Sequence, residues 1–369
     1  MAYLVKEIEQ AHILWFEASN QWVQFDEQQW LIFCLFEKRL SLKDAAKEIS
    51  QKLSVPEEQA IATVENIYQS LDKLFNPDFE LPDFTRNTRE ASLYTLPKKK
   101  QRSYSYQSKN FIMVYGSPFL EQYIHLPLAH LEVDTADENA FTLEVFPYED
   151  RYAIRINGTE GKCLSAEEPG QIKRLLYIEL SNYLYQKDEN SWLAFIHGSA
   201  LRKNDEIIVL TSTGGSGKST MAGFLILNGF DFFSDDYVPV EAQSKNAYPF
   251  PAALCVKNDA IQLLCSKGLK IQTTTSGKMG YARQMQKDIK ALPGKIKNVV
   301  FIKYCREKEI IFKPISKLEA LGLFLEEAWV GNDLKRAEQF MDWFTGLKFY
   351  RLEYGNSEKA IEALGKLMD

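Results

Sequence analysis

Glu206-Ile-Ile-Val-Leu-Thr-Ser-Thr-Gly-Gly-Ser-Gly-Lys-Ser-Thr-Met221 is the stretch that decides the fold, because an apolar, β-branched run enters a glycine-rich turn and then a helical pattern. This order predicts a strand, a phosphate-binding loop and a helix. The glycines allow successive backbone N–H groups to converge on phosphate oxygens, and the positive end of the helix adds to their field. The expected nucleotide-binding residues are Gly214, Gly215, Ser216, Gly217, Lys218, Ser219 and Thr220.

Two side chains of this loop have separate expected roles. The ammonium group of Lys218 would reach the β- and γ-phosphates, and the hydroxyl of Ser219 would bind Mg²⁺. The pattern G-x-x-x-x-G-K-[ST] is broken at its first position, where Ser212 replaces glycine, so the turn must tolerate a side chain there. ATP and Mg²⁺ are therefore the expected cofactors.

Two adjacent acids follow the loop. The segment Phe230-Asp-Phe-Phe-Ser leads into Asp235 and Asp236. Ligands bind beyond the carboxyl ends of strands in open α/β sheets, so a short strand ending here would bring both acids to the phosphate loop. One carboxylate can hold Mg²⁺ while the other accepts a proton from an attacking hydroxyl, and the pattern leaves the choice of base open. We expect Ser219 and Asp235 as metal ligands, and Lys218 and both acids as catalytic residues.

Three motifs occur in order along the second half of the chain: FIHGSAL around His197, STGGSGKST, and GFDFFSDD. Together they resemble the catalytic domain of HPr kinase/phosphorylase, which shares a phosphate-loop fold with the nucleotide-dependent phosphoenolpyruvate carboxykinases. The resemblance covers roughly residues 134–369. It implies an ATP-dependent kinase in which His197 is a further catalytic residue near the γ-phosphate or the acidic pair, and it allows a homo-oligomer.

One segment departs from that family. HPr kinases carry a glycine-rich signature with an acidic metal-binding residue after the acid pair, whereas Tyr248–Lys257 contains neither glycine nor acid. The sequence therefore supports neither HPr as the acceptor nor the phosphorylase reaction. Further along, the polar and basic segment 270–292 is either a mobile loop that closes over phosphates or a solvated helix.

The first 75 residues follow a different pattern. Aromatic and branched residues predict short strands at 3–8, 12–18 and 22–25, and three helices follow, with Asp26 and Ser41 as N-caps and Pro56 opening the third. This order resembles the PqqD-like winged-helix family, whose modules recognise peptides in ribosomal-peptide maturation. The resemblance implies a leader peptide added as a strand near Trp22. The alternatives are an unrelated small winged helix, and Trp15, Trp22 and Trp30 as core residues only.

Charge and composition limit the partners. The 369-residue chain has a formal charge of −6, and its first 75 residues carry seven Lys or Arg against twelve Asp or Glu, so we expect no nucleic-acid partner. Five scattered cysteines without a CxxC pair fit a reducing cytoplasm better than a disulfide framework or a zinc site. The sequence has no signal-peptide pattern and no long apolar run, so we expect a cytoplasmic protein with no membrane partner.

The expected organisation is α/β: a phosphate-loop kinase domain of the HPr kinase and carboxykinase-like type, preceded by a small α+β winged-helix domain. The expected boundaries are 1–80 for peptide recognition, 81–109 for a linker, 110–190 for an α+β part of the kinase-like body, and 191–369 for the nucleotide-binding part. The leading hypothesis is a kinase that transfers the γ-phosphoryl group to a hydroxyl of a peptide, protein or small molecule. The alternative is a catalytically silent ATP-binding scaffold in peptide maturation, and a DNA-binding regulator is disfavoured by the acidic first domain.

Overall fold

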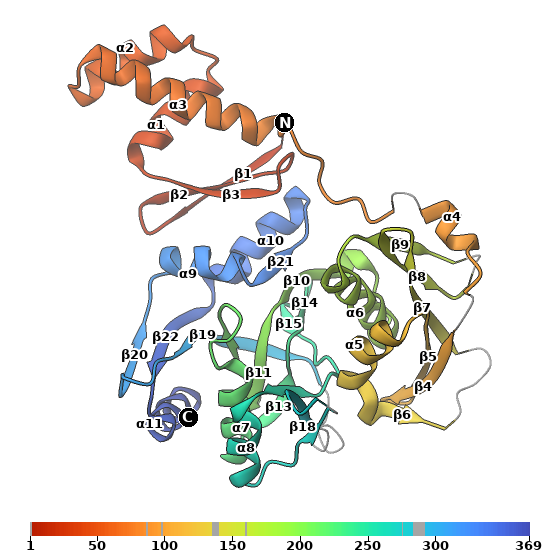
Figure 1. Cartoon of the computed structure of the whole chain (residues 1–369). Helices are drawn as coiled ribbons and strands as arrows, with labels where there is room; N and C mark the ends of the chain where they lie inside the picture. Colours follow the sequence, from red (N-terminus) through yellow and green to blue (C-terminus); the bar gives the residue numbers. More distant parts are fainter. Residues whose placement is uncertain are drawn as a thin grey trace. The chain divides into compact units, whose positions relative to one another are not determined.

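A computed structural model of the chain describes residues 2–85, 88–96, 99–134, 140–158, 161–274, 276–282 and 292–369 (Figure 1). The chain divides into two compact units. The first contains Met1–Pro82, Ser316–Leu321 and Val330–Gly346, and the second contains Asp83–Ile315, Gly322–Trp329 and Leu347–Asp369. Within the described ranges, no helix is both long enough and apolar enough to cross a membrane.

The first unit begins with an antiparallel sheet followed by three helices, as predicted. The strands are β1 (Tyr3–Ile8), β2 (Ala11–Phe16) and β3 (Gln21–Phe25), in the order β1-β2-β3, and the helices are α1 (Glu27–Glu37), α2 (Leu42–Leu53) and α3 (Glu57–Phe75). The carboxylate of Asp26 accepts a hydrogen bond from the N–H of Gln29, and the Ser41 hydroxyl accepts one from the N–H of Asp44, so both predicted N-caps are confirmed. The winged-helix and PqqD-like assignments stay predictions.

A distant segment of the chain completes this unit. Helix α10 (Leu334–Thr345) packs against β1, and the ring of Phe340 lies 5.5 Å from that of Trp22. Trp15 is fully buried, whereas Trp22 and Trp30 are half-buried. The boundaries 1–80 and 191–369 therefore need correction, because residues 316–321 and 330–346 belong to the first unit.

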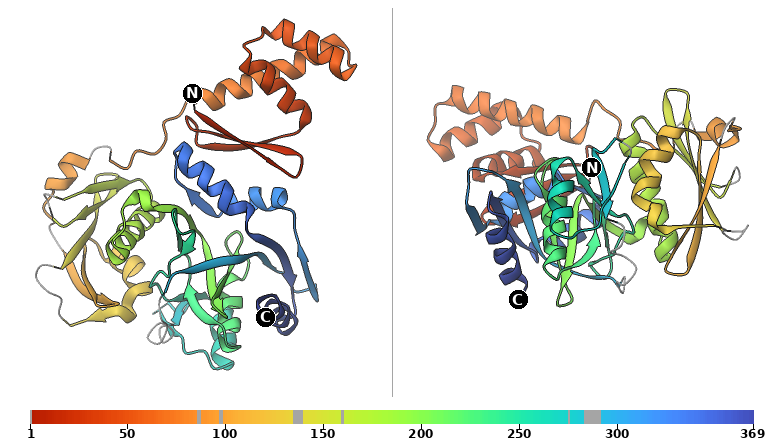
Figure 2. Two further views of the ribbon diagram at one scale, coloured as in Figure 1. Left: turned by 180° about the vertical axis from the view of Figure 1, so that it is seen from behind. Right: turned by 60° about the horizontal axis from the view of Figure 1, so that its bottom comes forward.

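The second unit contains a six-stranded sheet with helices on both faces. Helices α5 and α6 lie together on one side of it in both views of Figure 2, and the small helix α4 packs on the other side through Ala91. The strand order is β6-β4-β5-β7-β8-β9. The bounds are α4 (Thr88–Leu93), β4 (Lys100–Tyr106), β5 (Lys109–Tyr115), α5 (Pro118–Leu128), β6 (Glu132–Val133), β7 (Phe141–Tyr148), β8 (Arg151–Ile156), β9 (Cys163–Ala166) and α6 (Pro169–Tyr185).

Alternating residues at 141–146 and 152–156 predict a hairpin, and the antiparallel pair β7–β8 confirms it. The linker expected at 81–109 is wrong over much of its length, because its polar residues include α4 and the whole of β4, which pairs with β5. The side chains of β4 are exposed or half-buried except that of Tyr104, which gave this strand next to the sheet edge a linker-like composition.

The rest of the second unit is built on a ten-stranded mixed sheet, which confirms the α/β class. Its described strands follow the order β13-β11-β12-β19-β15-β14-β10-β21, with β22 paired to β19 and β20 to β22. They are β10 (Trp192–Ile196), β11 (Gly198–Lys203), β12 (Glu206–Thr211), β13 (Asp231–Ser234), β14 (Val238–Glu241), β15 (Asn246–Ala247), β19 (Gly294–Tyr304), β20 (Ile310–Pro314), β21 (Ala328–Val330) and β22 (Lys348–Tyr354). This unit also contains the helices α7 (Lys218–Leu227), α8 (Asp259–Ser266) and α11 (Ser357–Met368) and the small sheet β16 (Leu254–Lys257), β17 (Gln272–Thr273) and β18 (Met279–Ala282). Helix α9 (Lys317–Leu325) belongs in part to each unit.

The sheet topology places two loop ends at the same edge. Strands β12 and β13 both run antiparallel to β11, which lies between them, so they are parallel to each other. Their carboxyl ends therefore meet on one side of the sheet.

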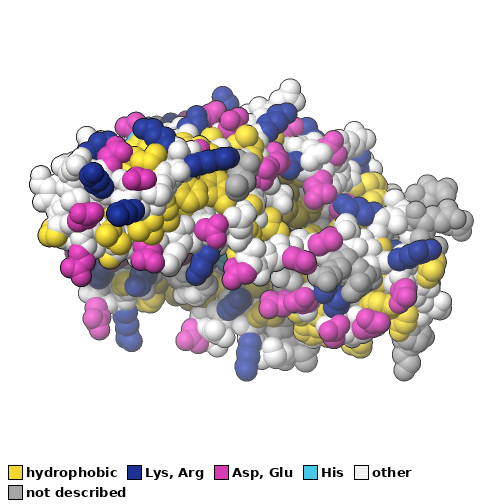
Figure 3. All heavy atoms as spheres, turned by 90° about the horizontal axis from the view of Figure 1, so that it is seen from above, with side chains coloured by type: hydrophobic (Ala, Val, Ile, Leu, Met, Phe, Trp, Pro, Cys, Tyr) yellow, Lys and Arg dark blue, Asp and Glu magenta, His cyan; other side chains and the backbone are white. Residues whose placement is uncertain are grey.

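On the face of the molecule drawn in Figure 3, basic and acidic side chains are interspersed rather than separated.

Candidate functional site

The glycine-rich loop connects β12 to α7 as the sequence predicts. Gly215 and Gly217 have φ angles of +82° and +98°, and Gly217 is the N-cap of α7. These backbone angles are costly for residues with a Cβ atom, so the two glycines are required by the turn. Ser212 is not among the described residues with positive φ, which explains how the loop tolerates serine at the first glycine position.

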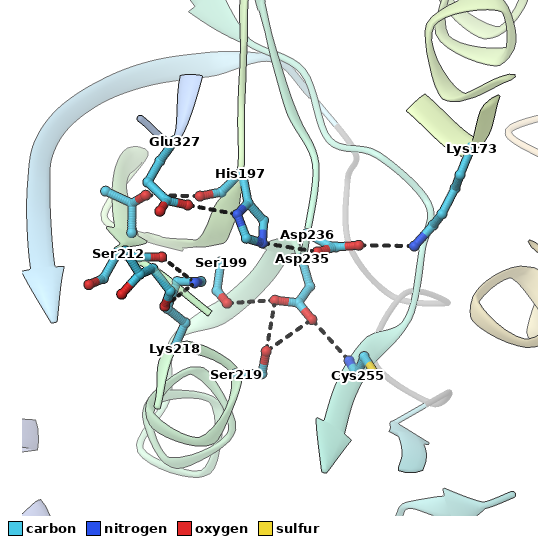
Figure 4. A network of polar contacts seen from close by, with 12 residues as sticks. Lys173, His197, Ser199, Ser212, Lys218, Ser219, Asp235, Asp236, Cys255 and Glu327 are labelled. Atoms are coloured by element: carbon cyan, nitrogen blue, oxygen red, sulfur yellow. Dashed lines mark hydrogen bonds and ion pairs between the residues drawn. The ribbon is translucent and has the colours of Figure 1, made fainter. Parts of the chain in front are cut away.

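Lys218 points back into its own loop. Its Nζ donates hydrogen bonds to the carbonyl oxygens of Ser212 and Thr213, the latter at 3.2 Å (Figure 4). Burial lowers the pKa of Lys218, because the charged ammonium group has lost part of its hydration. A phosphate would offer this cation stronger acceptors than two neutral carbonyls.

Asp235 is the buried member of the acid pair, with 3% of its surface exposed. Its carboxylate accepts hydrogen bonds from the Ser199 hydroxyl and from the N–H of Cys255 at 2.9 Å. The Ser219 hydroxyl lies 3.3 Å from both carboxylate oxygens. Burial raises the pKa of Asp235 to about 6 against the effect of the Ser199 hydrogen bond, and the charge of Asp236 adds to the rise.

Asp236 faces the other way and is half-exposed. Its Oδ1 lies 3.2 Å from Nε2 of His197, and its Oδ2 accepts a hydrogen bond from Nζ of Lys173 at 3.0 Å. Burial alone would raise the pKa of Asp236, but the hydrogen bond from His197 and the charge of Lys173 outweigh it and hold that pKa below its ordinary value. Asp236 is therefore an ionised carboxylate across the neutral pH range.

His197 lies in the break between β10 and β11. Its Nδ1 lies 2.7 Å from Oε2 of Glu327, and its backbone N–H donates to the carbonyl of the same residue. Both ring nitrogens of His197 face carboxylates. The hydrogen bond with Asp236 raises the pKa of His197, burial opposes this rise, and the hydrogen bond with Glu327 adds to it. The side chains Glu327, His197, Asp236 and Lys173 thus form a row of alternating charge, which Figure 4 shows.

The phosphate loop, both acids, His197 and Lys173 line one pocket of about 730 Å³. The predicted residues Gly214–Thr220, Asp235, Asp236 and His197 all line it, so the structure brings the whole predicted set together. The size falls within the usual range of small-molecule sites.

Four contributors were missed from the sequence: the ammonium group of Lys173, the Ser199 hydroxyl, the Cys255 N–H and the Glu327 carboxylate. Ser199 lies in the FIHGSAL motif, two residues after His197, so the motif was a signal that could have identified this hydroxyl. The segment 270–292 also differs from both expectations, because its described part includes β17 and β18, and Met279 and Tyr281 line the pocket. Its basic residues Arg283 and Lys287 lie outside the described residues.

The donor set at the loop fits Mg²⁺. The Ser219 hydroxyl and the Asp235 carboxylate are hard oxygen donors close enough to share one cation, and Mg²⁺ typically takes one or two protein ligands with phosphate oxygens and waters. No group of three or more His, Cys, Asp or Glu side chains with metal-binding geometry occurs in the part of the chain that the structure describes.

Comparisons with known proteins add little to this geometry. No protein-family model matches the sequence, and no curated protein matches it significantly. Among solved structures, the HPr(Ser) kinase/phosphatase from Coxiella burnetii matches over 47% of this chain and 90% of its own, with 8% identity and a TM-score of 0.24. The structure defines an α/β protein whose glycine-rich loop opens into a pocket that contains two adjacent carboxylates.

Proposed function

We propose that this protein is an ATP-dependent, Mg²⁺-requiring kinase that transfers the γ-phosphoryl group to a hydroxyl of its acceptor. One observation carries the proposal: the phosphate-loop residue Ser219 contacts Asp235, while the adjacent Asp236 faces the same pocket as a separate, half-exposed carboxylate. A buried acid at the cation position beside an accessible acid at the acceptor position is the division that phosphoryl transfer requires.

The residues then take distinct roles. The loop N–H groups and Lys218 would hold the phosphates, and Ser219 and Asp235 would hold Mg²⁺, which when bound neutralises charge on the phosphate oxygens. Asp236 would accept the proton of the acceptor hydroxyl.

Two further side chains would prepare Asp236 for this role. His197 and Lys173 fix its two oxygens from opposite sides, which orients the carboxylate without occupying every lone pair. Glu327 would in turn hold the ring of His197.

We also propose that the first unit selects the acceptor, which would then be a peptide or protein, including a ribosomally made precursor bound through its leader. The support is the edge position of β3, whose free side is able to pair with an added strand. The contact between Trp22 and Phe340 restricts this to the backbone edge of β3, since one ring of that strand is already packed.

The proposal is tested with the full chain, Mg²⁺-ATP and a pooled library of hydroxyl-containing peptides, with phosphate transfer followed by mass spectrometry. Asp236→Asn is expected to bind Mg²⁺-ATP like the parent protein and to lose transfer. Asp231→Asn is the matched control, because Asp231 is an exposed acid of β13 outside the pocket. Transfer by Asp236→Asn at the parental rate would refute the assigned base.

A different result separates the second hypothesis. A protein that binds Mg²⁺-ATP and a leader peptide but transfers phosphate to no peptide or small hydroxyl compound would be an ATP-binding scaffold. A protein that does not bind Mg²⁺-ATP would contradict both.

A further inference from the structure

The pocket continues beyond the acids to a second wall. This wall comes from α5 and α6, from β18 and from the segment that precedes and includes β16. Its aromatic and apolar side chains include Phe119, Tyr123, Tyr177, Met279 and Tyr281, and two lysines, Lys173 of α6 and Lys257 of β16, also line the pocket here. No carboxylate is among the described residues of this wall.

Two rings of α5 form an open surface on this wall. Phe119 and Tyr123 are one helical turn apart on α5, and their rings are stacked. The ring centroids lie 5.7 Å from each other, with an interplanar angle of 8°. Phe119 remains 52% exposed although it is a large apolar side chain at a pocket. An aromatic ring with a free face offers an apolar or CH-rich group a stacking partner.

The wall begins where the acidic site ends. Nζ of Lys173 donates to Asp236 and also lies 5.2 Å from the ring centroids of both Tyr123 and Tyr177. Figure 4 shows Lys173 reaching Asp236 from the side opposite His197. A group stacked on the α5 rings would therefore extend toward the carboxylate that is proposed to take the proton.

From these observations we infer that the aromatic wall of α5 and α6 is the acceptor subsite, and that it takes a hydroxyl compound whose reacting oxygen lies a few bonds from an apolar ring. The inference rests on the proposed kinase function and adds the chemical class of the acceptor. A seryl peptide with a neighbouring aromatic residue and a small aromatic alcohol share this chemistry.

The test measures binding of defined probes to the full chain in the presence of Mg²⁺ and a non-hydrolysable ATP analogue, by saturation-transfer NMR titration. The peptide probes are N-acetyl-Ser-Phe-amide and its matched analogue N-acetyl-Ser-Ala-amide, which lacks the ring, and the small-molecule probe is 2-phenylethanol. We expect at least one aromatic probe to bind and the alanine probe to bind about tenfold more weakly or not at all, because it has no ring to stack. Binding of neither aromatic probe, or equal binding of the alanine probe, overturns the inference.

Variants locate the bound probe. Phe119→Ala is expected to weaken binding of the aromatic probe about three- to tenfold, because it removes a stacking partner. Phe119→Leu is expected to cause a smaller loss of affinity. Ile311→Ala removes an exposed apolar side chain on β20, away from the pocket, and is the control. An aromatic probe that binds Phe119→Ala as tightly as the parent protein would place it elsewhere and overturn the assignment.

A calorimetric titration with Mg²⁺-ATP separates failure of the acceptor subsite from failure of the proposed kinase function. If the parent protein fails to bind Mg²⁺-ATP in a calorimetric titration, the proposed function fails. If it binds Mg²⁺-ATP and the aromatic probes do not bind, only the acceptor subsite fails.

Discussion

Replacing Asp235 by Asn should stabilise the ligand-free protein while removing the proposed cation site. Burial raises the pKa of Asp235 from its ordinary 3.8 to about 6, so the folded protein is destabilised by ionising this group at neutral pH. At 1.36 kcal/mol for each tenfold change in the ionisation constant, the cost is about 3 kcal/mol. Asparagine keeps the shape and can still accept from the Cys255 N–H, so we expect a gain of about 1–3 kcal/mol.

The sign of the pH dependence makes the prediction specific. A group whose pKa is raised in the folded state loses stability as pH rises from its unfolded to its folded value. The advantage of Asp235→Asn should therefore be small at pH 4, grow up to about pH 6, and stay constant above it.

Thermal unfolding with EDTA at pH 4.5 and 7.5 measures this difference. A rise of about 2–6 °C is expected at pH 7.5, at about 2 °C per kcal/mol for a unit of this size. The exposed-acid variant Asp231→Asn should show no such pH-dependent gain. A variant less stable than the parent at pH 7.5, or one with the same advantage at both pH values, would refute the reasoning from burial.

Three further substitutions probe the loop and the charged row. Lys218→Ala should weaken ATP binding in calorimetry by about tenfold or more, because a charge-assisted contact contributes ~1.5–3 kcal/mol; unchanged affinity would contradict the role of the loop. Gly217→Ala should cost about 1–2 kcal/mol in urea unfolding, because its φ is +98°, whereas Gly365→Ala in the interior of α11 should be neutral or stabilising by up to ~1 kcal/mol. Glu327→Gln should lower the pKa of His197 in an NMR titration, since one of its two carboxylate partners is lost, and an unchanged titration would show that Asp236 alone sets it.

The sequence predicted the local elements well because their signals are local. The β-branched run before the loop became β12, and the helix begins at Lys218, since the glycines and the apolar residues on either side act over a few positions. The linker prediction failed for the same reason. A polar strand such as β4 differs from a linker mainly in its pairing with β5. Local composition does not predict which segments pair.

The site residues that the sequence did not identify lie far from the phosphate loop along the chain. Lys173 lies on α6 and Glu327 follows α9, so neither belongs to a motif around the loop. Each is brought to the pocket by tertiary packing, and nothing in its own neighbours distinguishes it from a surface Lys or Glu. A sequence pattern can therefore name the residues next to the phosphate loop, while those that orient the second acid emerge only from the fold.

The backbone at the acid pair explains how two adjacent, identical residues acquire opposite chemistry. Asp236 has a φ of +67°, a left-handed conformation that aspartate tolerates better than most residues. This turn ends the extended path of β13, so the carboxylate of Asp235 enters the buried site with Ser199 and Ser219, while that of Asp236 opens into the pocket between His197 and Lys173. One environment raises a pKa and the other lowers it, although the two residues are neighbours in the chain. The left-handed turn at position 236 thus gives the two acids separate environments, which the proposed separation of cation ligand from base requires.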